Sequence, residues 1–256
     1  MNCVPMTDSL LSERSKEVYA YLDFLKVAVG RHAVLTAKDG SRETVFPMSL
    51  ELTHTLKANL FLLLYSATEA TLIQLLDEMH DAIGNNCSNA DALNDDLRRV
   101  ILKTFKKDDS FTVLKTRDPL QMSLFSYWIA DWRKRTRAKD KRADGISGSV
   151  DGRVFYEQLK KFGVVSKTED DKPHSHLTDR ALQMVKTKRN ELAHGEISFT
   201  DLGREFSVTP LEDAALAVFE TLQKIASEVN LYLHNQRYLA QPVVPVEQPV
   251  TESIES

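Results

Sequence analysis

The stretch LKANLFLLLYSATEATLIQLLDEM, Leu56–Met79, is the most apolar run of the chain and decides its fold class. Its middle is apolar on nearly every side of a helical wheel, which is typical of a helix buried in the centre of a protein. The surrounding pattern predicts one helix from Leu50 to about Ile83, with Gly84 as its C-terminal cap. The run LFLLLYSA is too short to span a bilayer, so we expect a soluble protein.

Long helix-compatible segments lie on both sides of this stretch, and the chain of 256 residues has only nine glycines. We therefore expect an all-α protein, an up-and-down helical bundle with extra helices. The further helices are predicted over about 7–33, 90–106, 119–142, from near 151, 178–194 and 210–236, with a short hairpin or extended piece at 36–47. We expect an N-terminal helix and polar connection over 1–50, the bundle over 51–236, and a proline-rich, disordered tail over 237–256.

Cysteine usage and the N-terminus limit the classes of protein that fit. Cys3 and Cys87 are the only cysteines, which provides neither a disulfide framework nor a zinc motif. The first residues carry acids and lack the apolar segment of a signal peptide. We expect a cytoplasmic protein, and the net charge of −4 says little about its partners.

A second stretch, KTKRNELAHGEISF (186–199), places one charge on an apolar helix face. The predicted helix carries an apolar stripe that includes Arg189, and the central helix carries one that includes Glu69. The apolar members are Leu182, Val185, Leu192 and Ala193 in the first stripe, and Leu62, Tyr65, Leu72 and Leu76 in the second. Burying an unpaired charge is costly, so Arg189 needs an anion or a wet cleft. Two interpretations fit: a structural Glu69–Arg189 ion pair, or a polar pocket in which Glu69 holds Arg189 ready for a ligand phosphate.

Asn190 and His194 are four residues apart and share one face beside this stripe. A guanidinium, an amide and a titratable imidazole are the groups needed to hold a phosphate and move a proton near neutral pH. Residues five apart are about 140° apart on an ideal helix, so Arg189 and His194 do not point the same way. A long arginine could curl round, or a second chain could complete the site.

The motif RNELAHG (189–195) matches the R-x4-6-H signature of HEPN domains, the higher eukaryotes and prokaryotes nucleotide-binding family. Three segments, LKANLFLLLYSATEAT, GISGSVDGRVFYEQLKKFGV and KRNELAHGEISFTDLGREFSV, resemble the MAE-type bacterial stand-alone HEPN proteins in order and spacing. The resemblance covers about Glu51 to Tyr232.

This resemblance implies a HEPN-type helical bundle that forms a homodimer and brings two motifs into one cleft. It also implies a metal-independent endoribonuclease without a cofactor, in which the ribose 2′-hydroxyl attacks the adjacent phosphate. His194 would be the general acid or base, Arg189 would stabilise the phosphorane charge, Asn190 would orient the phosphate or the histidine, and Glu69 would support them. The implied partners are RNA and an antitoxin or defence-system protein, with no membrane. Glu196 stands where another HEPN group carries a modified tyrosine, so that mode of control is not implied.

Two other functions remain open. The first is a non-catalytic RNA- or nucleotide-binding HEPN module that acts as a regulatory partner. The second is a structural helical protein in which Glu69 and Arg189 form a buried ion pair.

The basic run RKRTRAKDKR (133–142) predicts a phosphate-tracking surface or, equally, a solvated helix end. Its candidate RNA contacts are Arg133, Lys134, Arg135, Arg137 and Lys139, and the aromatic residues before it are Phe125, Tyr127, Trp128 and Trp132. These rings belong to the core more readily than to an RNA-stacking surface. We expect no metal site: His174 and His176 read as part of a polar loop, and His54 and His80 as helix-surface residues. GISGSVDG (145–152) predicts a flexible loop near the cleft.

Overall fold

The computed structural model describes residues 6–30, 33–105, 117–137, 149–165 and 180–240. Within them the all-α prediction is confirmed, because helices account for every element except one small hairpin. The elements are α1 (Met6–Ala28), β1 (Val34–Asp39), β2 (Arg42–Pro47), α2 (Leu50–Asn86), the 3-10 helix η1 (Ala90–Ala92), α3 (Asp95–Phe105), α4 (Arg117–Arg137), α5 (Gly152–Phe162), α6 (Arg180–Ala193), α7 (Phe199–Arg204) and α8 (Val208–His234).

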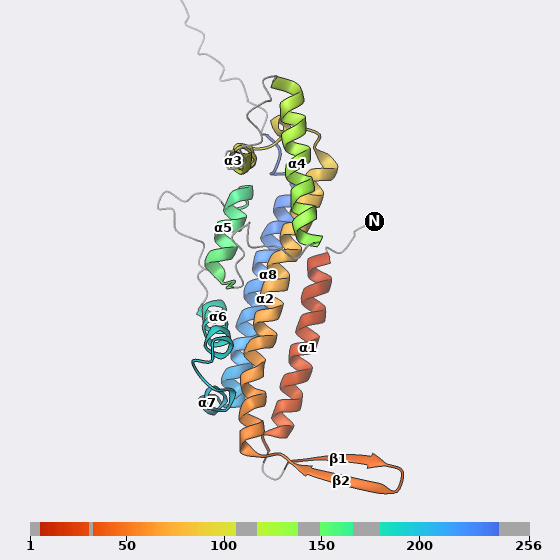
Figure 1. Ribbon diagram of the computed structural model, residues 1–256, viewed down its shortest axis with the longest axis vertical. Coiled ribbons are helices and arrows are strands. Elements are labelled where there is room, and N and C mark those ends of the chain that lie inside the picture. Colours follow the sequence, from red (N-terminus) through yellow and green to blue (C-terminus); the bar gives the residue numbers. More distant parts are fainter. Residues whose placement is uncertain (1–5, 31–32, 106–116, 138–148, 166–179, 241–256) are drawn as a thin grey trace, which may run out of the picture.

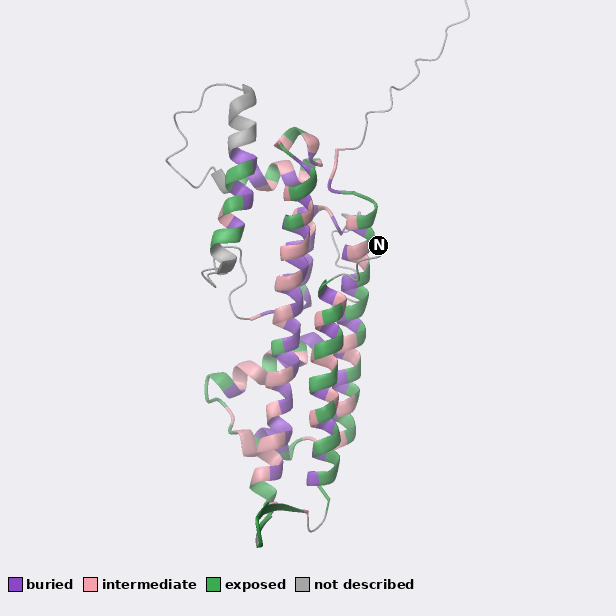
Figure 2. Cartoon of the chain, turned by 90° about the vertical axis from the view of Figure 1, so that its right-hand side faces the viewer, coloured by how far each residue is buried: buried purple, intermediate pink, exposed green. Residues whose placement is uncertain are grey.

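The long helices α1, α2 and α8 run side by side along the long axis, and α5, α6 and α7 lie on one side of them (Figure 1). Buried residues follow α2 along most of its length (Figure 2), and the side chains of Leu60, Phe61 and Leu64 have no exposed surface. Among the described helices, only α2 is long and apolar enough to cross a membrane, and 56% of its most apolar stretch is buried inside the bundle. Such burial is typical of the core helix of a soluble protein.

Helix α2 begins where the sequence predicts but ends later. The Ser49 side chain caps it by accepting a hydrogen bond from the Leu52 amide at 3.1 Å. Gly84 is not the cap, because the helix continues to Asn86 and ends at Cys87. A Cβ on Gly84 would lie 3.3 Å from the Ile129 side chain, so the glycine instead allows α4 to approach α2 closely.

Helix α4 is anchored to α2 by buried aromatic rings. Trp132 stacks on His80 with ring centroids 4.1 Å apart, and its indole N–H donates to the Asp77 carboxylate at 2.7 Å. His80 is therefore a buried residue of the α2–α4 contact, and the prediction that it lies on the helix surface was wrong. Phe125 and Trp128 are buried as well, which confirms the core interpretation for three of the four aromatic residues.

Helix α7 lies in the stretch predicted to be a connection between the last two helices. It packs on the N-terminal half of α2 so closely that a Cβ on Gly203 would lie 1.8 Å from the His54 carbonyl oxygen. The buried Lys57 ammonium group donates to the Phe206 carbonyl just after α7, at 2.6 Å.

The predicted hairpin is confirmed and projects from the end of the bundle at which α2 begins (Figure 1). At the other end of the sequence, residues 237–240 are packed, not disordered as predicted. Tyr238 is buried, its carbonyl accepts from the Asn94 amide, and Leu239 bridges to Leu93. Residues 241–256 lie outside the described part of the chain.

Candidate functional site around Arg189

Helix α6 ends in a hydrogen-bonded cap that fixes the backbone around His194. The Gly195 amide donates to the Leu192 carbonyl and the Glu196 amide to the Glu191 carbonyl, the paired bonds of a Schellman motif. Gly195 adopts the left-handed conformation that this cap requires, with φ of 72°. The motif therefore places His194 immediately after the helix, with its side chain exposed.

The Arg189 side chain lies half-buried against α2. Its guanidinium carbon is 4.4 Å from the centre of the Tyr65 ring, and its Nη1 donates to the Asn190 side-chain oxygen at 3.0 Å. Glu69, although described, does not pair with it: no ion pair joins α2 to Arg189 within the described residues. The predicted Glu69–Arg189 pair was wrong because Arg189 reaches α2 one helical turn before Glu69, where Tyr65 meets it.

The residues just before α5 complete the surroundings of Arg189. The Val150 amide donates to the Tyr65 hydroxyl at 3.0 Å, and the Asn190 side-chain amide donates to the Ser149 hydroxyl at 3.2 Å. The contacts therefore form a closed ring, from Tyr65 to Arg189, to Asn190, to Ser149 and through Val150 back to Tyr65. Three segments distant in the sequence meet here, namely α2, residues 149–151 and α6.

Asp151 fastens this segment in two ways. Its carboxylate accepts from the Val154 amide at 3.1 Å, which caps α5, and it pairs with the Lys186 ammonium group at 2.6 Å. Asp151 is only 8% exposed, so the pair is better shielded from solvent than an ordinary surface ion pair. The stretch 145–152 was predicted to be a flexible loop near the cleft. Its residues 149–151 lie at the Arg189 site, and residues 145–148 lie outside the described part of the chain.

The cations of α6 differ in how their charge is neutralised. Lys186 pairs with Asp151, and Lys188 pairs with Glu191 at 3.0 Å and with Glu205 at 3.5 Å. Burial alone would lower the pKa of Lys188, but the two carboxylates outweigh burial and raise it. Within the described part of the chain, Arg189 has no carboxylate partner, and its remaining N–H groups are available to an anion.

The environment of Tyr65 keeps its hydroxyl protonated. Burial is the main cause that raises the pKa of Tyr65, Glu69 adds to it, and the Val150 amide and Arg189 oppose it. The negative charge of Glu69 is thus felt at the Tyr65 hydroxyl, and no ion pair joins Glu69 to Arg189 within the described residues.

The structure brings together only part of the predicted catalytic set. Arg189 and Asn190 are joined by a hydrogen bond, but no described contact joins Arg189 to His194, which agrees with the 140° separation. Ala193, predicted to be apolar and buried, is exposed. Sequence reasoning missed the roles of Ser149, Asp151 and Tyr65. The signals were present, because the first two close the glycine-rich stretch and Tyr65 precedes Glu69 by one turn.

The basic run at the end of α4 is described only in part. Arg133 and Lys134 are exposed, and Arg133 pairs with Asp81 at 3.1 Å. Arg135 and Arg137 occupy the last turn of α4, but their side chains, and the whole of Lys139, lie outside the described residues. Asp81 is sixteen residues along α2 from Tyr65, so this run starts about 24 Å from the Arg189 site along the helix axis.

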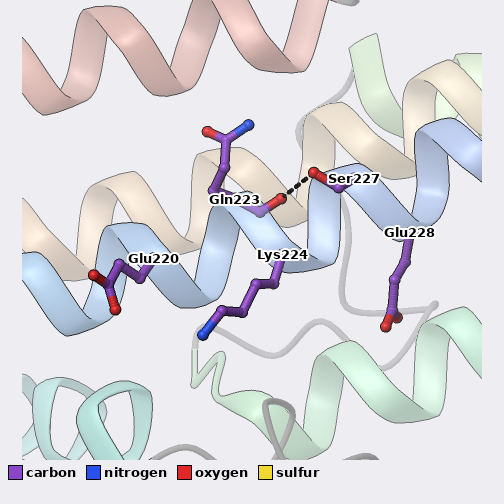
Figure 3. A pocket seen from close by; sticks show the side chains of 5 residues that line it. All are labelled: Glu220, Gln223, Lys224, Ser227 and Glu228. Atoms are coloured by element: carbon purple, nitrogen blue, oxygen red, sulfur yellow. Dashed lines mark hydrogen bonds between the residues drawn. The ribbon is translucent and has the colours of Figure 1, made fainter.

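A groove of about 630 Å³ runs along α8, away from the motif. Figure 3 shows its lining residues, all on α8: Glu220, Gln223, Lys224, Ser227 and Glu228. None of them contacts Arg189 or His194. No group of three or more His, Cys, Asp or Glu side chains is arranged to hold a metal ion within the described residues, and His174 and His176 lie outside them.

The comparison with protein families agrees with the motif and the fold. No curated protein and no solved structure matches the chain. Residues 8–238, which include α1 apart from its first two residues and all later described helices, match one family of helical domains. The chain therefore belongs to the HEPN_MAE_28990-like HEPN family.

Proposed function

We propose that this protein is a metal-independent endoribonuclease whose reaction is centred on Arg189 and His194. Membership of the HEPN family makes it a nuclease- or RNA-related module in general terms. The observation that carries the finer proposal is the state of Arg189: a half-buried guanidinium, oriented by a ring and an amide, with no carboxylate partner among the described residues. Phosphate is one of the anions that such a fork-shaped donor binds through two parallel hydrogen bonds, and it is the anion that RNA presents.

In this mechanism the ribose 2′-oxygen attacks the adjacent phosphorus and the bond to the 5′-oxygen breaks. A general base takes the 2′-hydroxyl proton and a general acid protonates the leaving 5′-oxygen, so the products are a 2′,3′-cyclic phosphate and a 5′-hydroxyl. His194 supplies this proton transfer, and Arg189 stabilises the negative charge on the phosphorane. Asn190 orients the guanidinium through its side-chain oxygen, and the charge of Glu69 supports the site from α2. No step requires a metal or cofactor.

We propose that two copies of the chain share the site. In one chain the exposed His194 lies past the end of α6 while Arg189 turns inward to Tyr65, so one copy does not direct both groups at one phosphate. A homodimer with the two α6 ends facing one another supplies one histidine as base and one as acid. RNA enters along the basic side chains Arg133, Lys134, Arg135, Arg137 and Lys139. A role in a toxin–antitoxin or phage-defence system, with an antitoxin or defence protein as partner, belongs to this proposal.

A second candidate is supported by the same separation of Arg189 from His194. If no second copy completes the site, the chain binds RNA or a nucleotide through Arg189 without cleaving it, as a regulatory module. The structural interpretation loses its support, because the ion pair on which it depends is absent among the described residues.

The experiment that tests the proposal is cleavage of total cellular RNA by the purified protein in EDTA. Wild type is compared with His194→Ala and with His234→Ala, which removes another exposed histidine at a helix C-terminus. We expect wild type and His234→Ala to cut RNA and leave cyclic-phosphate and 5′-hydroxyl ends, and His194→Ala to be inactive.

Two results would contradict the nuclease assignment. Equal cutting by wild type and His194→Ala would place the activity elsewhere. RNA binding without cutting by any of the three proteins would favour the regulatory module.

A further inference from the structure

We propose that Tyr65 is a positioning residue of this site: its ring holds the Arg189 guanidinium, and its hydroxyl fixes the segment that orients Asn190. This inference rests on the proposed function and extends it to a residue on α2 that the motif does not contain. It explains how an arginine without a carboxylate partner keeps one orientation.

The ring of Tyr65 provides one wall for the guanidinium. The 4.4 Å separation between the guanidinium carbon and the ring centre is within the range of a cation–π contact. Tyr65 is 4% exposed, so its ring cannot swing away without disturbing the bundle. An aromatic face, unlike a carboxylate, holds the guanidinium without neutralising its charge, so Arg189 keeps its attraction for a phosphate.

The hydroxyl of Tyr65 makes a second, separate contribution. It accepts the Val150 amide at 3.0 Å, and the neighbouring Ser149 accepts from Asn190 at 3.2 Å. Asn190 in turn accepts from Arg189 at 3.0 Å. Tyr65 therefore provides the ring face that Arg189 contacts and also fixes the position of residues 149–150, which bind Asn190. Orienting the reacting groups in this way accelerates a reaction.

The molecule contains a matched pair outside the site. Arg237 lies over the ring of Tyr232 at 5.7 Å, and the Tyr232 hydroxyl donates to the Phe162 carbonyl at 2.6 Å. Tyr232 is buried like Tyr65 and likewise combines an arginine contact with a hydrogen bond, but it belongs to α8 and contacts no residue of the motif. It controls for the general cost of removing a buried tyrosine.

The test is a double-mutant cycle on RNA affinity. The variants are Tyr65→Leu, Arg189→Ala and the double variant, together with Tyr65→Phe, which keeps the ring and guards against a failure of Tyr65→Leu to fold. The probe is a single-stranded RNA oligonucleotide methylated at every 2′-hydroxyl, which cannot be cleaved by the proposed route. Affinity is therefore measurable in every variant, whether or not the wild type is a nuclease.

We expect Tyr65→Leu to weaken binding about tenfold in the wild-type background and less than about twofold in the Arg189→Ala background, because residues in contact are coupled. Tyr65→Phe loses the hydroxyl contribution but keeps the ring, so it should weaken binding by a smaller factor than Tyr65→Leu. In NMR spectra it should retain the upfield ring-current shift of the Arg189 δ-protons, which Tyr65→Leu should abolish. Tyr232→Leu should have the same effect in both backgrounds. With cleavable RNA, Tyr65→Leu should lower kcat by a larger factor than it raises KM.

The outcomes separate this proposal from the proposed function. If Tyr65→Leu weakens RNA binding by the same factor with and without Arg189→Ala, the two residues act independently. That result would overturn the positioning role even if the wild type cuts RNA. Coupled effects on affinity in a protein that cuts no RNA would support the positioning role and overturn the nuclease. Failure of the wild type to bind the oligonucleotide would overturn both.

Discussion

Arg189 contacts α2 through an aromatic ring, and this determines what its removal would cost. A cation–π contact at a partly exposed site is worth about 0.5–1 kcal/mol, whereas breaking a buried ion pair costs about 3–5 kcal/mol. We therefore expect Arg189→Ala to lower the free energy of unfolding by about 1 kcal/mol, and Glu69→Gln to change it less, while the alanine variant abolishes RNA cleavage. Urea denaturation followed by circular dichroism measures both variants. A loss above about 3 kcal/mol for Arg189→Ala would show that Arg189 stabilises the bundle by more than a cation–π contact.

Gly195 sets the backbone that carries His194. Its φ of 72° is strained for a residue with a Cβ, yet no atom lies within 4 Å of the position that a Cβ would take. The cost of Gly195→Ala is therefore conformational alone, about 1–2 kcal/mol. Gly195→Asn should cost less, since asparagine tolerates this conformation. Thermal denaturation tests whether Gly195→Ala loses more stability than Gly195→Asn. Equal losses of stability in the two variants would show that something other than backbone strain determines the cost.

At the level of single residues, the sequence predicts the motif better than its surroundings. The spacing of Arg189, Asn190 and His194 along one helix follows directly from helical geometry. The partner on α2 does not, because Glu69 and Tyr65 share a face, and which of them meets Arg189 depends on how α6 is placed along α2. That placement depends on contacts, such as Lys186 with Asp151, between segments far apart in the sequence.

Among the elements, the contact of α7 with α2 depends on a glycine. A Cβ on Gly203 would overlap the His54 backbone, whereas a Cβ on Gly84 would meet only side-chain atoms, the nearest of them at 3.3 Å. We expect Gly203→Ala to separate α7 from α2 and to cost more than about 2 kcal/mol of unfolding free energy, and Gly84→Ala to cost less than about 1 kcal/mol. Equilibrium unfolding of the two variants measures the difference. Similar small losses would mean that α7 can shift on α2 at little cost.

The start of α5 depends on Asp151, which combines a helix cap with an ion pair. Asp151→Asn keeps an oxygen that can cap the Val154 amide but loses the charge that pairs with Lys186, whereas Asp151→Ala loses both. A cap contributes about 1 kcal/mol. We expect the alanine variant to be less stable than the asparagine variant by that amount, and hydrogen exchange in the first turn of α5 to rise most in the alanine variant. Equal stability of the two would exclude the capping role.

For elements, apolar periodicity predicts long helices well and short ones badly. The α2 stretch is apolar on all sides, so its burial could be predicted directly from the sequence. The hairpin was predicted from the polar stretch 36–47, which separates the first two long helices. Helix α7 was missed because six residues carry too little periodic pattern, and its formation depends on packing against α2. The burial of His80 was missed for a related reason: the tryptophans that cover it come from α4.

For the whole molecule, the contact between α1 and α2 predicts how stability changes at high pH. The Tyr21 hydroxyl on α1 donates to the Leu56 carbonyl on α2 at 2.6 Å, and burial raises the pKa of Tyr21 to about 12, with a small opposing effect from Asn59. The same tyrosine in the unfolded chain has a pKa of about 10. The unfolded state therefore loses its proton first, so the contribution of Tyr21 to stability is fully present below pH 10 and is lost as the pH rises towards 12.

Tyr21→Phe removes both the hydrogen bond and this titration, so it should be the less stable protein at pH 8, by about 1 kcal/mol. The gap in unfolding free energy between the wild type and Tyr21→Phe should then narrow between pH 10 and 11.5, because only the wild type has a Tyr21 proton to lose. Urea denaturation at pH 8, 10 and 11.5 measures the gap, and a gap that stays constant would show that Tyr21 does not link the packing of α1 to pH.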